Sequence, residues 1–282
     1  MPAIVACIDG SLYSPSVADH AAWAAGRLGG AVELLQVLGR REVGPADLSG
    51  SLEADASAHL LDELATLDAQ RARLAQKRAR LVMDEVRARI LGQGVGEVAI
   101  SLRQGDLLEA IAEREAGAEL IVVGKRGEAA DFAKLHLGSN LERIVRASQR
   151  PVLVASRAFK PINRALIAFD GGASTLEAVD YISRSPLFAG LEIHLVTVGA
   201  DEPALRKRLD AAAGRLAGTG LRVETHVRAG TPDRAIAEAV GGLGADLLVM
   251  GAYSHTRLRT LFIGSTTTEM IRSCLVPVML FR

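Results

Sequence analysis

The sequence repeats itself, and the repeat restricts the fold more than any other feature. Asp9-Gly10 follows an apolar run near the start, and Asp170-Gly171 follows a similar run 161 positions later. Four further landmarks recur in the same order, but only about 126 positions apart. The repeat predicts two homologous domains, 1–157 and 158–282, with about 35 extra residues in the first, inside a helical insertion at about 40–93. The further landmarks are Gly105, Gly124, Gly138-Ser139 and Pro151 in the first copy, and Gly230, Gly251, Gly264-Ser265 and Pro277 in the second.

Within each copy, short apolar runs alternate with helical segments. The runs Ala31–Leu38 and Leu191–Val198 are typical of strands buried on both faces, and Ser14–Leu28 is typical of a connecting helix. This alternation predicts an α/β fold in which each copy is an open five-stranded parallel sheet with helices on both sides. Ligands of such sheets bind beyond the carboxyl ends of the strands. We therefore expect Asp9 and Asp170 to lie at one crevice per copy.

The composition excludes several classes of function. Basic and acidic residues both number 33, so a formal net charge of zero argues against general electrostatic binding to nucleic acid or to an anionic membrane, and we expect no specific nucleic-acid partner and no membrane partner. No apolar run approaches the roughly 20 residues of a membrane-spanning helix, and we expect a cytoplasmic protein. Cys7 and Cys274 are expected to pack in the core. The six histidines show no paired spacing such as His-x3-His, so we predict no metal site.

The start of the last helix carries the clearest binding signal. Gly264-Ser265-Thr266 opens that helix, and Gly138-Ser139 occupies the same place in the first copy. A helix that begins after glycine offers backbone N–H groups and a positive dipole end to phosphate oxygens. The same residues can instead form an ordinary N-cap. This motif by itself leaves both interpretations open.

The wider layout resembles the universal stress protein family. Met250–Arg259 followed by Gly264-Ser265 is similar to tandem members, and the resemblance covers nearly the whole chain twice, except the insertion. It implies a Rossmann-like fold of the adenine-nucleotide alpha-hydrolase type, with Pro151 and Pro277 opening strands that pair the copies as an intramolecular pseudo-dimer. It also implies ATP binding through Gly-x2-Gly-x9-Gly-Ser/Thr, with the first-strand Asp near the ribose and adenine and the backbone after the second strand in contact with the base. The implied nucleotide-binding residues are Asp9, Val37, Gly124, Gly127, Gly138 and Ser139 in the first copy, and Asp170, Val196, Gly251, Ser254, Gly264, Ser265 and Thr266 in the second.

Neither copy matches that motif in full. The first keeps its glycines but has ten residues, Glu128–Leu137, between the second and third, and two of them are acidic. The second has the right spacing but carries Ser254 in place of a glycine. Its loop contains His255, Arg257 and Arg259, which suit phosphate better. We therefore favour the second copy as the site for ATP, with ADP or AMP as alternatives and Mg²⁺ carried only by the nucleotide.

Two functions follow from these observations. The first is a stress-response module that binds ATP or ADP with little or no hydrolysis and has no catalytic residues. The second is a nucleotide-free scaffold that binds an unknown protein partner through the insertion helix, at about 52–91. Leucines recur every seven residues on that helix, but no second apolar column completes a coiled-coil seam. Its acidic start and basic end suit the helix dipole. The sequence does not decide whether two copies of the chain form a further homodimer.

Overall fold

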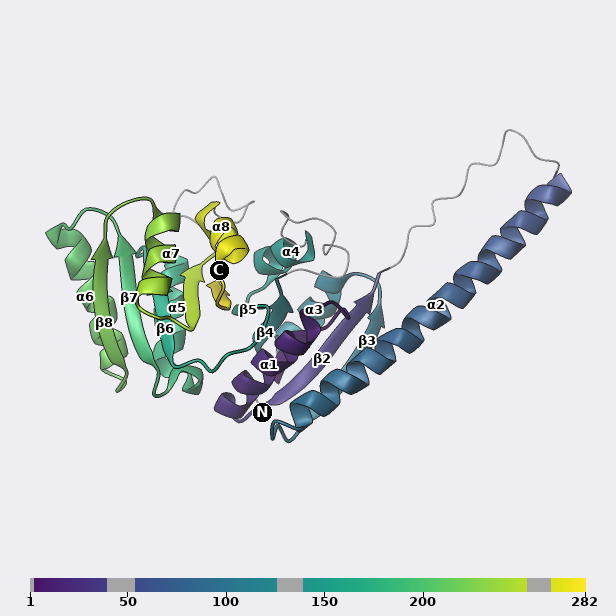
Figure 1. The fold of residues 1–282 in the computed structure, drawn as a ribbon, viewed down its shortest axis with the longest axis horizontal. Helices are drawn as coiled ribbons and strands as arrows, with labels where there is room; N and C mark the ends of the chain where they lie inside the picture. The colour runs from purple at the N-terminus through teal and green to yellow at the C-terminus, as the bar shows by residue number, and fades with distance from the viewer. Residues whose placement is uncertain (1–2, 40–53, 126–138, 253–264) are drawn as a thin grey trace.

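The two copies form one continuous sheet in the computed structural model, which describes residues 3–39, 54–125, 139–252 and 265–282 (Figure 1). The strand order is β3-β2-β1-β4-β5-β10-β9-β6-β7-β8, so each copy contributes five neighbouring strands. Strands are parallel within each copy, as predicted. The strands are β1 (Ala3–Cys7), β2 (Ala31–Leu38), β3 (Val98–Gln104), β4 (Ala118–Gly124), β5 (Val152–Ala155), β6 (Arg164–Ala168), β7 (Glu192–Val198), β8 (Arg222–Arg228), β9 (Leu247–Gly251) and β10 (Val278–Phe281).

Helices cover both faces of the sheet. One face carries α1, α2, α5 and α6, and the other carries α3, α4, α7 and α8. No helix in the described part of the chain is both long and apolar enough to cross a membrane. The helices are α1 (Ser14–Leu28), α2 (Ala54–Leu91), α3 (Leu107–Glu115), α4 (Ser139–Ala147), α5 (Ala173–Arg184), α6 (Pro203–Ala217), α7 (Pro232–Gly242) and α8 (Ser265–Ser273), with a short 3-10 helix η2 (Pro186–Phe188).

The central strands supply side chains to both layers. In β4, Leu120 and Val122 belong to the core under α1, whereas Ile121 and Val123 belong to the core under α3 and α4. All four side chains are buried, as expected for a parallel strand covered on both sides. Each core continues from the first copy into the second without a break.

The two copies meet where β5 pairs with β10 in antiparallel register. Leu153 lies opposite Met279, and both side chains are fully buried. Each strand is the edge of its own half and becomes central in the complete sheet. The prolines that precede these strands do not interrupt the ladder, because the Pro151 and Pro277 carbonyls accept hydrogen bonds from neighbouring strands at 3.0 Å. The pairing of the copies implied by the family resemblance is thus present within one chain.

The insertion is an elongated version of a helix that both copies share. In each copy the second and third strands are joined by a helix on the same face: α2 in the first, with 38 residues, and α6 in the second, with 15. The C-terminal half of α2 packs on the sheet through Ala79, Met83, Val86 and Ile90, which are buried. Its N-terminal half extends well beyond the sheet (Figure 1).

Candidate functional site

An Asp-Gly turn follows the first strand of the second copy. Asp170 accepts two hydrogen bonds at Oδ1, from the Gly172 amide at 2.8 Å and from the Thr175 hydroxyl at 2.7 Å. Gly171 has φ +76°, a conformation that side chains other than glycine adopt with strain. The aspartate therefore fixes the turn that leads into α5, in addition to any contact with a ligand.

The first copy builds the same turn. Asp9 Oδ1 accepts hydrogen bonds from the Ser11 amide at 3.0 Å and the Ser14 hydroxyl at 3.5 Å. Gly10 also has φ +76°. Ser14 and Thr175 thus make equivalent hydrogen bonds to the aspartates, although the residues around them differ.

A guanidinium group lies beside each turn. A Cβ placed on Gly171 would lie 3.3 Å from Nη1 of Arg208 in α6, and one placed on Gly10 would lie 3.9 Å from Nη2 of Arg78 in α2. The sequence does not indicate that Arg78 and Arg208 are equivalent, because α2 has 38 residues and α6 has only 15. Each Asp-Gly turn therefore has a guanidinium group close to its glycine.

The carboxyl end of β9 lies next to this turn in the second copy. Ala168 of β6 pairs with Met250 of β9, so Asp170 and Gly251 follow neighbouring strand ends. Gly251 is needed for packing, because a Cβ there would lie 3.0 Å from Cβ of Ser174. Its carbonyl accepts a hydrogen bond from the Thr267 hydroxyl at 3.0 Å, which ties the first turn of α8 to β9.

The predicted helix starts coincide with the observed ones. α8 begins at Ser265, which is exposed, and Thr266 follows half-buried, while α4 begins at Ser139. In the first copy Ala6 of β1 pairs with Val122 of β4, so Asp9 and Gly124 also follow neighbouring strand ends. The remaining predicted residues, Gly127, Gly138, Ser254 and Gly264, lie outside the described residues.

The sheet register corrects one predicted pair. Val37 and Val196 were expected at equivalent positions of the two copies, but the carbonyl of Val196 accepts the Phe169 amide at 2.8 Å, just as Leu35 accepts Ile8 at 2.9 Å. The counterpart of Val37 is therefore Val198, two residues later in β7. Val196 has its carbonyl engaged inside the sheet and its side chain buried in the core. Of the two valines in β7, Val198 stands closer to the strand end, where a ligand would bind.

The Cys7 thiol, in β1 before Asp9, is held in its unreactive protonated form. Burial, together with the negative charge of Asp9, raises the pKa of the Cys7 thiol to about 12. Burial also raises the pKa of Cys274. Both thiols stay protonated near neutral pH, which agrees with the expected packing role.

The comparisons with known proteins agree with this architecture. The model of the universal stress protein family matches residues 1–156 and again 161–282. Universal stress protein Slr1230 from Synechocystis is 35% identical, and the match covers 100% of both chains. A universal stress protein structure from Archaeoglobus fulgidus has a TM-score of 0.74 at 23% identity, covering 99% of this chain and 98% of its own. A putative universal stress protein from Pseudomonas aeruginosa has a TM-score of 0.64 at 20% identity, covering 100% of this chain and 93% of its own. The chain therefore belongs to the universal stress protein family, as a tandem member with two copies of the family domain.

Proposed function

We propose that the chain binds an adenine nucleotide, ATP or ADP, at the carboxyl ends of β6 and β9. The observation that carries the proposal is the meeting of the Asp170 turn, the Gly251 strand end and the start of α8 at one edge of the sheet. Parallel sheets bind ligands at this edge, and a helix start is a phosphate site. Hydrolysis is little or none in this proposal, and Mg²⁺ enters only with the nucleotide.

The charges of the crevice suit an anionic ligand. Arg208 lies beside Gly171, and the positive end of the α8 dipole faces the same edge. The first copy has an equivalent arginine, Arg78, and an equivalent helix start at Ser139. Both copies are therefore candidates, and the cationic loop of the second makes it our preferred site.

The test places a negative charge where phosphate is expected. Ser265→Asp should lower the affinity for ATP at least tenfold, because the carboxylate repels phosphate at the helix start. The variant should stay folded, since an acidic residue in the first turn stabilises a helix. Titration calorimetry with ATP, ADP and AMP, with and without Mg²⁺, measures the effect, and release of phosphate measures hydrolysis.

Ser265→Asn is the matched control, because it has a similar size without the charge. It should keep most of the affinity. Ser139→Asp repeats the test in the first copy and assigns the site to one copy or both. Failure of the unaltered protein to bind any of the three nucleotides at millimolar concentration would contradict the proposal.

A second candidate function rests on the projecting half of α2. Four leucines are exposed there, and they lie on a different side of the helix from the residues that pack on the sheet. Such an apolar row on a solvated helix is typical of an interaction surface. The exposed fractions are 37% for Leu60, 41% for Leu64, 48% for Leu67 and 67% for Leu74.

Charge complementarity favours a second copy of this chain as the partner. Asp62, Glu63 and Asp68 precede Arg71, Arg73 and Lys77 along the same helix. An antiparallel pair of α2 helices places the acidic segment of one beside the basic segment of the other, whereas a parallel pair places like charges together. We therefore propose antiparallel self-association, with the Arg71 stem completing the apolar row.

Leu67→Glu together with Leu74→Glu should convert the dimer to a monomer without a loss of helix content. Light scattering coupled to size exclusion, over a range of protein concentrations, measures the mass. Leu176→Glu, at an exposed site on α5, is the control and should leave the dimer intact. A monomeric parent protein at 100 μM, the order of concentration at which a weak dimer assembles, would refute the self-association.

A further inference from the structure

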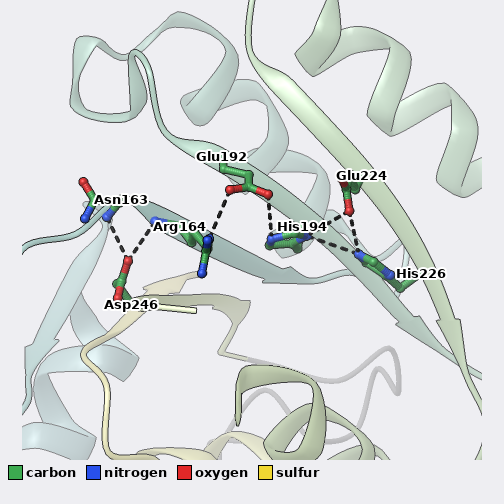
Figure 2. Close-up of polar contacts among 7 residues, drawn as sticks. All are labelled: Asn163, Arg164, Glu192, His194, Glu224, His226 and Asp246. Carbon is green, nitrogen blue, oxygen red and sulfur yellow. Dashed lines mark hydrogen bonds and ion pairs between the residues drawn. The ribbon is translucent and has the colours of Figure 1, made fainter. Parts of the chain in front are cut away.

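Two histidines and a glutamate converge on the second copy, away from the strand ends discussed above. His194 lies in the middle of β7, and Glu224 and His226 lie on β8, the last strand of the sheet. The register pairs His194 with Glu224 and Val196 with His226, so the three side chains share one face of the sheet (Figure 2). The side chain of His194 is 5% exposed, that of His226 17% and that of Glu224 64%.

Three donor atoms of this cluster form a closed triangle. Nδ1 of His194 lies 3.2 Å from Nε2 of His226 and 3.7 Å from Oε2 of Glu224, and the latter two atoms are 3.9 Å apart. The point in their plane that is equidistant from the three atoms lies about 2.1 Å from each, which is the length of zinc–nitrogen and zinc–oxygen bonds. A four-coordinate ion sits above that plane, so binding requires small side-chain rotations that draw the three atoms closer together.

The other nitrogen of His194 faces a supporting carboxylate. Nε2 lies 3.5 Å from Oε1 of Glu192, and Oε2 of Glu192 lies 3.1 Å from Nε of Arg164 (Figure 2). Asp246 in turn accepts hydrogen bonds from the backbone amides of Asn163 and Arg164 at 2.9 and 3.0 Å. Nε2 makes no hydrogen bond among the described residues, and a proton on it would face Glu192 and leave the lone pair of Nδ1 directed into the triangle. Metal-binding histidines commonly have such a carboxylate behind them.

The first copy shows what occupies the equivalent place when no histidines are present. By sheet register, Glu33 corresponds to His194 and Ser101 to His226. There Arg114 of α3 donates to Glu33 at 2.6 Å and to Ser101 at 2.7 Å, so a cation is held between the two strands. Counted from the helix start, the residue of α7 that matches Arg114 is Ala239, which is buried and has no charge. The second copy therefore has no arginine at this place, and it has His194, Glu224 and His226 where the first copy has Glu33, Ala99 and Ser101.

We propose that His194, Glu224 and His226 bind one divalent transition-metal ion, with Zn²⁺ as the best match. Two imidazoles and one carboxylate are a common zinc ligand set, and the solvent side of Glu224 leaves room for water as the fourth ligand. The ion would join the edge strand β8 to β7, at the place where Arg114 joins β3 to β2. Sequence spacing could not indicate this site, because the ligands come from two strands about 30 residues apart.

The test is a titration of chelator-treated, nucleotide-free protein with Zn²⁺. Calorimetry should show one ion per chain with a Kd of about 10 μM or tighter, and Co²⁺ should give the intense visible absorption of a four-coordinate site. Zn²⁺ should also raise the melting temperature, because it binds only the folded chain. His226→Gln should weaken binding at least tenfold, and it spares the buried His194.

Two further variants distinguish this site from other metal-binding groups. His59→Gln, outside the cluster, should bind Zn²⁺ like the parent. Ala239→Arg should abolish binding while the protein stays folded, because a guanidinium then takes the place of the ion, as in the first copy. No binding at 100 μM Zn²⁺, or equal affinity of the parent and His226→Gln, would overturn the proposal.

Discussion

Replacement of Leu153 by alanine is expected to destabilise the chain by about 3 kcal/mol, within the range of roughly 2–5 kcal/mol for buried leucines. Leu153 is fully buried in β5, opposite Met279 of β10, at the only strand pair in the described sheet that joins the two copies. The cavity would open in a core that both copies share. We therefore expect both halves to lose stability together, although the substitution lies in the first.

Urea unfolding followed by circular dichroism measures this effect. Because the core is continuous across the β5–β10 pair, the parent and the variant should each unfold in a single transition, with the midpoint of the variant at lower urea. Leu176→Ala is the matched control: its side chain is 46% exposed, and its cost should stay below about 0.5 kcal/mol. Separate transitions for the two copies, with only the first one shifted, would show that the halves are independent.

The topology was predictable because the repeat and the apolar runs carry it directly. A chain that repeats a strand–helix alternation twice can bury its apolar runs only in parallel sheets, and both five-stranded halves were found as predicted. The helix starts at Ser139 and Ser265 were predictable for a similar reason, since glycine followed by serine marks a helix start in the sequence itself.

The parts that were not predictable depend on contacts between distant segments. Arg78 and Arg208 reach their glycine turns from helices of different length, so only the structure aligns them. The equivalence of Val37 with Val198 rests on the strand register, which a single residue of misalignment changes. His194 and His226 meet because β7 and β8 are neighbours, and their spacing of 32 residues in the sequence does not indicate this contact.

The insertion helix was predicted in extent but only half in role. The sequence favoured a helix at 52–91 that binds a protein partner, and α2 spans Ala54–Leu91. Its C-terminal half covers the sheet, whereas in its N-terminal half Leu60, Leu64, Leu67 and Leu74 are exposed. Deletion of the whole helix would therefore remove Met83 and Ile90 from the core as well, so point substitutions at the projecting leucines are the better probe of interaction.

Replacement of Arg114 by alanine is the second large effect that we expect. The Arg114 side chain is 10% exposed and that of Glu33 is 28% exposed, so the ion pair at 2.6 Å is largely removed from solvent. Loss of one partner of a buried pair costs about 3–5 kcal/mol, because the other charge stays buried. The partial exposure of Glu33 reduces this, and we expect about 2–3 kcal/mol by urea unfolding.

A double-mutant cycle separates the pair from the packing of the arginine stem. Glu33→Gln in the Arg114→Ala background should recover part of the loss, because no charge then stays unpaired between β2 and α3. If Glu33→Gln adds its own full cost to that of Arg114→Ala, the pair contributes nothing, and Arg114 acts through its stem and its hydrogen bonds to Ser101 and the Ala110 carbonyl. A measured coupling would mean that the first copy depends on a fixed cation between its second and third strands. The second copy has Ala239 at that place, and the metal ion that we propose between His194 and His226 would supply the cation that this copy lacks.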